Sequence, residues 1–155
     1  MLEHTITARL PSNPRHVLGC LASTATQALL CRPAFWLRVP PTDLFPGGRF
    51  PVRARYRRVL PTGAWVFTVD ALSEAATLGE ESELMLRALE GPVPNLTIRT
   101  VLVGDRSVST IAETLTGEPR GPVAAFLLGR LAAQRERRYP LLFSGSLPPG
   151  AQLAH

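Results

Sequence analysis

Hydrophobic and polar residues alternate along much of the chain, and this period of two predicts β-strands. Residues 2–10 form the first such segment, with Leu2, Ile6 and Leu10 on one side. The clearest alternation covers residues 50–59, where one face holds Phe50, Val52, Ala54 and Tyr56 and the other holds Arg53, Arg55 and Arg57. Further strands are predicted at residues 34–39, 64–70, 96–103 and 107–116. Turn residues at 61–63 and 104–106 predict two hairpins.

Two other regions have the pattern of helices. Residues 14–30 predict one or two short helices, with Ser12 or Asn13 as the N-cap and a break near Ser23 and Thr24. Residues 121–138 predict a long helix, because Pro122 suits a first helical position and Val123, Phe126, Leu127 and Leu131 recur with helical spacing. Its last turn gathers Arg135, Arg137 and Arg138, which favour the negative end of the helix dipole. Residues 83–89 stay open, since their residue types favour a helix and their alternation favours a strand.

This order of elements predicts an α+β fold. About six or seven strands joined by short loops indicate a curved antiparallel sheet, with one or two short helices after the first strand. The apolar C-terminal helix needs a partner surface and belongs across one face of that sheet. We expect one domain over residues 1–143 and a mobile tail over residues 144–155, where serine, glycine and proline are frequent.

Composition narrows the function classes. The chain has 155 residues, and all 17 of its basic residues are arginine, which gives a formal net charge of +5. Cys20 and Cys31 lack the spacing of metal ligands, so no metal or cofactor is expected, while a disulfide between them stays open. The first residues lack the pattern of a signal peptide, and no apolar run is long enough to span a membrane. We therefore expect a bacterial cytoplasmic protein rather than an integral membrane protein; the oligomeric state stays open.

The arrangement resembles the START/SRPBCC superfamily, the helix-grip fold of Bet v 1-like and polyketide cyclase-like proteins. The resemblance covers nearly the whole chain and rests on architecture, in particular the opening strand HTITARL, the hairpins RFPVRARYRRVLPTGAWVFTVD and LTIRTVLVGDRSVSTIAETLTG, and the closing helix. It implies a curved sheet wrapped around the last helix, with a hydrophobic small molecule or lipid gripped between them. Some members of this superfamily are cyclases and others are carriers, so the resemblance fixes no activity, and we expect an uncharacterised branch.

If the resemblance holds, inward side chains line a ligand cavity. The candidates are Trp36 (or its neighbour Phe35), Phe50, Tyr56, Trp65, Phe67, Ile98, Ile111, Phe126 and Leu127. The same residues also suit a filled hydrophobic core, so both interpretations stand at this point.

Catalytic and anion-binding chemistry have weaker support. His4 lies on the apolar face of the first strand and is expected to be a structural histidine; Asp70 and Glu113 fit either an inward acid or base or a salt bridge with a neighbouring arginine. No residue is therefore assigned to catalysis, and a cyclase-like enzyme is a third hypothesis.

The second hypothesis is an anion- or nucleic-acid-binding surface formed by Arg53, Arg55 and Arg57, which are spaced about 7 Å apart along a strand, close to the spacing of successive phosphates. The alternative is a solvated outer sheet face.

Overall fold

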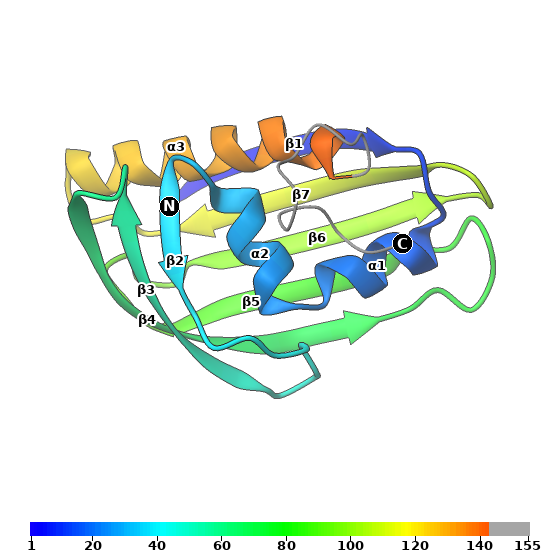
Figure 1. Ribbon diagram of the computed structural model, residues 1–155, viewed down its shortest axis with the longest axis horizontal. Coiled ribbons are helices and arrows are strands. Elements are labelled where there is room, and N and C mark those ends of the chain that lie inside the picture. The colour runs from blue at the N-terminus through cyan, green and yellow to red at the C-terminus, as the bar shows by residue number, and fades with distance from the viewer. Residues whose placement is uncertain (143–155) are drawn as a thin grey trace.

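The computed structural model describes residues 1–142, which form one antiparallel sheet with helices on its concave side (Figure 1). In chain order the elements are β1 (Leu2–Leu10), α1 (Pro14–Leu21), α2 (Thr24–Cys31), β2 (Phe35–Arg38), β3 (Arg49–Tyr56), β4 (Leu60–Ser73), β5 (Ser82–Glu90), β6 (Thr97–Gly104), β7 (Ser109–Gly117), α3 (Pro122–Arg138) and a 3₁₀-helix (Tyr139–Leu141). The predicted boundary at residue 143 and the predicted tail at 144–155 lie outside the described residues.

The sheet has the order β1-β7-β6-β5-β4-β3-β2, and every neighbouring pair is antiparallel. It is strongly curled: β2, β3 and β4 bend up at one end toward the start of α3 (Figure 1). The α+β fold predicted from the sequence is confirmed, with seven strands among the described residues. The open segment, residues 83–89, belongs to the central strand β5, and it forms a strand because β4 and β6 pair with it on both sides. Its Leu84, Leu86 and Ala88 are buried in the core.

The region after β1 forms two short helices. The Asn13 side chain accepts a hydrogen bond from His16 N at 2.9 Å, and Ser23 does the same for Thr26 N at 3.2 Å, so each helix begins at a side-chain cap. The predicted break near Ser23 is therefore confirmed. α1 packs against β5, β6 and β7, while α2 packs against β2 and α3. No helix within residues 1–142 is both long and apolar enough to cross a membrane.

The turn between β3 and β4 comes earlier than predicted. The chain reverses at residues 57–59, where Arg57 (φ 54°) and Arg58 (φ 67°) adopt left-handed backbone conformations. The predicted turn at residues 61–63 is wrong: β4 already begins at Leu60, and Pro61 pairs with Arg55 after a register shift between Ala54 and Arg55. Two residues with left-handed φ turn the chain before the proline and glycine are reached.

Helix α3 has the predicted bounds but a different buried face. Val123 is 65% exposed and Phe126 is 55% exposed, so the predicted stripe through these two residues is wrong. The residues that face the sheet follow the spacing i, i+3, i+4, i+7, i+8 and i+11, and they are Ala124, Leu127, Leu128, Leu131, Ala132 and Arg135. This face is rotated from the predicted one and includes a charged residue.

Candidate ligand-binding cavity

A cavity of about 120 Å³ lies between the inner face of the curled sheet and α3. Its wall is formed mainly by apolar side chains of β2, β3, β4, β6 and α3, together with the loop between β5 and β6. The polar residues on the wall are Gln27, Cys31, Thr62 and Arg135. We call this space the ligand cavity.

Five of the nine cavity candidates named from the sequence meet on this wall. They are Phe50, Trp65, Phe67, Ile98 and Leu127. The Phe67 ring stacks on Phe50 and on Trp65, with ring centroids 5.8 Å apart in both pairs. The alternation of β3, β4 and β6 therefore places three aromatic rings and Ile98 opposite Leu127 of α3.

The other four candidates lie elsewhere. Ile111 is fully buried in the core, and Trp36 packs against the guanidinium groups of Arg32 and Arg58, while its neighbour Phe35 is on the cavity wall. Tyr56 and Phe126 contact each other edge-to-face, with ring centroids 6.2 Å apart, outside the cavity.

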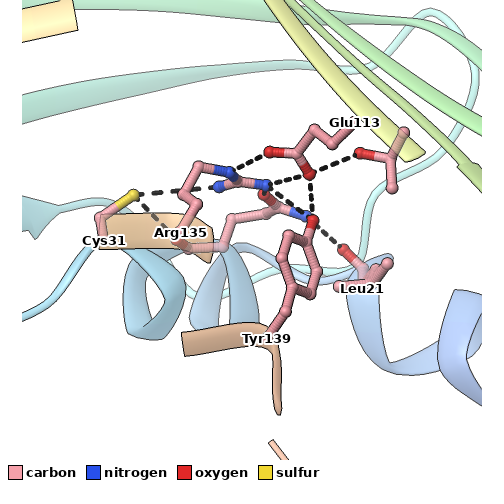
Figure 2. Close-up of polar contacts among 7 residues, drawn as sticks. Leu21, Cys31, Glu113, Arg135 and Tyr139 are labelled. Atoms are coloured by element: carbon pink, nitrogen blue, oxygen red, sulfur yellow. Dashed lines mark hydrogen bonds and ion pairs between the residues drawn. The ribbon is translucent and has the colours of Figure 1, made fainter. Parts of the chain in front are cut away.

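A buried ion pair joins β7 to α3 beside the cavity. Glu113 is inaccessible to solvent and Arg135 is 1% exposed. The guanidinium donates from Nε to Glu113 Oε1 and from Nη2 to Oε2, the second bond measuring 3.1 Å, so the pair is bidentate (Figure 2). The two charges are therefore desolvated and compensate each other in the low-dielectric interior.

Further polar groups complete this cluster. Thr100 Oγ1 donates to Glu113 Oε2 at 3.0 Å, and the Tyr139 hydroxyl donates to the same oxygen. Arg135 Nη2 also donates to Gln27 Oε1 at 3.0 Å, and the Gln27 amide is itself held by a 2.9 Å hydrogen bond to the Leu21 carbonyl (Figure 2). These hydrogen bonds thereby tie together six elements, namely β6, β7, α1, α2, α3 and the 3₁₀-helix.

The environment fixes the charge of each member. Burial lowers the pKa of Arg135, but the adjacent Glu113 carboxylate more than offsets this effect and holds that pKa well above its usual range. Burial and the charge of Glu113 raise the pKa of Tyr139 far above the ordinary tyrosine value. Burial also raises the pKa of the Cys31 thiol, although Arg135 opposes the shift. At neutral pH the cluster thus holds a guanidinium cation, a neutral phenol and a neutral thiol.

Among the described residues, one guanidinium nitrogen of Arg135 has only a weak acceptor near it. Within residues 1–142 the acceptor near Arg135 Nη1 is the Cys31 sulfur at 3.9 Å, and sulfur accepts hydrogen bonds weakly. Arg135 and Cys31 both belong to the cavity wall. A ligand oxygen placed there would find an N–H donor that the protein leaves almost unused.

Sequence reasoning offered a salt bridge for Glu113 as one alternative but missed its partner, because it assigned Arg135 to the favourable end of the helix dipole. A signal was present: Arg135 continues the spacing of Leu128, Leu131 and Ala132 on the buried face, and Glu113 alternates with Ile111 and Leu115. A charged residue at a core position on each of two elements favours a buried pair.

The remaining chemical candidates have plain structural roles. Asp70 pairs with Arg87 on the neighbouring strand at 2.6 Å, and His4 is partly buried with its Nε2 unpartnered among the described residues. Cys20 and Cys31 are both free thiols, which answers the open question of a disulfide. No group of three histidine, cysteine or acidic side chains within residues 1–142 is placed to hold a metal ion.

The arginine row occupies the outer side of β3. Arg53 and Arg55 lie on that face, whereas Arg57 follows the end of the strand and belongs to the turn. β2 places Arg38 directly opposite Arg53 and Trp36 opposite Arg55.

No family model matches this sequence, and no curated protein matches it. Solved structures do share its architecture. TTHA0849 from Thermus thermophilus is 16% identical, with a TM-score of 0.57 over 94% of this chain and 100% of that one. Ms6760 from Mycobacterium smegmatis is 15% identical, with a TM-score of 0.57 over 95% and 93% of the two chains. CV1439 from Chromobacterium violaceum is 16% identical, with a TM-score of 0.55 over 87% and 94%. At these identities the likeness shows a common fold alone.

Proposed function

We propose that the protein binds a small, mainly apolar molecule in the ligand cavity, with an acceptor atom of that molecule directed at Arg135 Nη1. The observation that carries this proposal is a guanidinium only 1% exposed on the wall of an otherwise apolar cavity. Small-molecule sites typically combine an apolar lining with a few polar groups that fix orientation.

The cavity volume limits the ligand. About 120 Å³ is close to the volume of roughly 150 Å³ in an engineered apolar cavity that accepts benzene. The stacked rings of Phe50, Phe67 and Trp65 provide flat surfaces on one side. A single-ring compound therefore fits this proposal best, and a long acyl chain would require the sheet and α3 to separate.

Charge balance limits the acceptor group. Glu113 already compensates Arg135, so a carboxylate ligand would bring a second buried negative charge without a second cation. A carbonyl, ether or phenol oxygen would accept from Nη1 and leave the buried charge balanced. The ligand we propose is thus a neutral ring compound with one oxygen acceptor.

We further propose that the chain is a divergent helix-grip protein of the START/SRPBCC type. The order of its elements, the cavity between sheet and last helix, and the likeness to solved structures support this assignment. Binding is favoured over cyclase-like catalysis, because the polar residues on the wall within residues 1–142 include no carboxylate or histidine that would act as a general acid or base.

The test combines a search for a bound molecule with a binding measurement. Native mass spectrometry of the purified protein, before and after denaturing extraction, should reveal a small molecule that is released on unfolding. Fluorine NMR with fluorobenzene and 4-fluorophenol should show broadening of both signals, and tighter binding of 4-fluorophenol because its oxygen meets Arg135.

Two neighbouring alanines provide a matched pair of variants. Ala124 is on the cavity wall and Ala125 is not, yet both are half-buried in the first turns of α3. We expect Ala124→Phe to fill the cavity and abolish the fluorine line broadening, and Ala125→Phe to preserve it. Equal binding by the two folded variants would place the probe outside the cavity and contradict the proposal.

A further inference from the structure

The outer side of β2 and β3 carries a second concentration of unusual residues, on the opposite face of these strands from the ligand cavity. Phe35, Leu37, Val52 and Ala54 face the cavity, so the residues that alternate with them along each strand point outward. Those are Trp36 and Arg38 on β2, and Arg53 and Arg55 on β3. We call these four residues the arginine face.

Two of these arginines oppose each other without a counter-charge. Arg38 and Arg53 are direct cross-strand partners, and like charges in that position destabilise a sheet. Within residues 1–142 the ion pairs involve Arg15, Arg87, Arg99 and Arg135, so no carboxylate neutralises the arginine face. The described surface thus keeps an uncompensated pair of cations at one point of an edge hairpin.

A hollow lies between these two side chains. It has a volume of about 360 Å³, and its wall consists of Arg38, Val39, Pro40, Pro51 and Arg53. Two rigid prolines and a valine form its apolar part, and a guanidinium stands on each strand beside it. Such a hollow suits a ligand that joins an apolar moiety to an anionic group.

Two further arginine side chains pack against the Trp36 ring. The Arg58 guanidinium lies 3.8 Å from the centroid of the Trp36 ring, and the Arg32 guanidinium lies 4.5 Å from it. A cation–π contact restrains each of these side chains without using its N–H donors for a hydrogen bond. Arg55, opposite Trp36, continues the charge along β3.

We propose that the arginine face binds the phosphodiester backbone of single-stranded nucleic acid. One phosphate lies between Arg38 and Arg53, the next one meets Arg55, and the nucleotide on the other side of the first phosphate rests on Pro40 and Pro51. Arg53 and Arg55 are two residues apart on a strand, about 7 Å, which matches successive phosphates. A bilayer fits less well, because the exposed large apolar residues of α3, Val123 and Phe126, do not line this hollow.

Fluorescence anisotropy with a short fluorescein-labelled oligothymidylate tests this proposal. We expect binding at low salt that weakens steeply as salt rises, and at least a tenfold loss of affinity in the double variant Arg38→Ser/Arg53→Ser. For single strands each phosphate contact contributes about 0.7 to the slope of log affinity against log salt; because Arg38 and Arg53 share one phosphate, that slope should fall by about 0.7.

The matched control is Arg87→Ser/Arg99→Ser, which removes the same charge from arginines that pair with Asp70 and Glu83 on other strands. We expect the control to retain most of its affinity. Equal losses in the two double variants, or no binding at low salt, would overturn the proposal. So would loss of binding to phosphatidylglycerol vesicles in Arg38→Ser/Arg53→Ser without any effect on the oligonucleotide.

A second variant guards against misfolding of the first. Arg55→Ser removes a single exposed side chain, and circular dichroism should show an unchanged fold. We expect it to weaken oligothymidylate binding several-fold and to lower the salt slope by about 0.7; unchanged affinity would remove Arg55 from the site.

Discussion

Among single residues, Arg135 and Glu113 have the largest expected effect on stability, because each is the only buried counter-charge that the described structure gives the other. Replacing Arg135 by methionine leaves the Glu113 carboxylate buried and uncompensated. We expect Arg135→Met to lower the free energy of unfolding by about 3–5 kcal/mol, measured by urea denaturation. The double variant Glu113→Leu/Arg135→Met should recover most of this loss.

A solvent-exposed pair is the control for that measurement. Arg99 and Glu83 are partly exposed, so Arg99→Met should change stability by less than about 1 kcal/mol. If Arg135→Met were no more destabilising than Arg99→Met, the buried pair would carry no special weight in this fold.

Tyr139 makes stability depend on alkaline pH. Its pKa is raised well above the ordinary 10.0 by burial and by the Glu113 charge, so the unfolded chain ionises before the folded one. The stability contributed by the neutral phenol is complete below about pH 10 and is lost as the pH rises further. In Tyr56→Phe, where Tyr139 is the sole tyrosine, tyrosinate absorbance should appear only together with unfolding. Ionisation near pH 10 in a still-folded protein would contradict this prediction.

Some side-chain positions could be predicted from the sequence, and others could not. Alternation placed Phe50, Phe67 and Ile98 on the inner side of the sheet, because a strand points every second side chain the same way. The same rule could not tell Trp36 from Phe35 in a strand of four residues, since both neighbours are aromatic. The partner of Glu113 was hidden because it comes from α3, and the contact between β7 and α3 is set by tertiary packing.

At the scale of elements, the bounds of α3 follow from its sequence, whereas its orientation does not. Apolar residues surround its first three turns, so several stripes compete, and contact with the sheet selects Ala124, Leu127 and Leu131 rather than Val123 and Phe126. Segment 83–89 is a similar case. Its helix-favouring residue types are overridden because β4 and β6 offer hydrogen-bonding partners on both sides.

The loop between β5 and β6 is predicted to hold the cavity aromatics in place. A Cβ atom at Gly91 would lie 2.1 Å from the Trp65 ring, which itself stacks on Phe67. Gly91→Ala must therefore displace the indole, and we expect a loss of about 1–3 kcal/mol in urea denaturation, with changed fluorescence of Trp65 in a Trp36→Phe background.

Gly19 provides the contrasting substitution. It is exposed in α1, and an added Cβ there would contact nothing within 4 Å. Gly19→Ala should stabilise the protein by about 0.5–1 kcal/mol, because alanine suits a helix better than glycine. If Gly19→Ala and Gly91→Ala changed the free energy of unfolding in the same direction, close contact with Trp65 would not be the cause of the effect of Gly91→Ala.

At the scale of the whole molecule, the two faces of strands β2 and β3 provide two different chemical environments. Strands β2 and β3 present phenyl and aliphatic groups to the cavity and arginines to solvent, so a substitution on one face can leave the other face unchanged. The order of elements was enough to predict this architecture, because short loops enforce antiparallel neighbours and an apolar helix must cover a sheet. The volume left between them depends on how side chains pack, which a pattern of hydrophobic positions does not encode.

Access to that volume can be measured through the two free thiols. Cys31 is 4% exposed and lies on the cavity wall, whereas Cys20 is half-buried on α1. In the variant Cys20→Ser, we expect the bulky, charged reagent dithionitrobenzoate to modify Cys31 only as fast as the fold opens. Methyl methanethiosulfonate is small and uncharged, and it should reach Cys31 in the folded protein through the cavity, a difference that intact-mass spectrometry would record. Bound 4-fluorophenol should slow the second reaction and leave the first limited by opening. If methyl methanethiosulfonate also modified Cys31 only as fast as the fold opens, Cys31 would be reached by unfolding alone and the cavity would be closed to ligands in the native state.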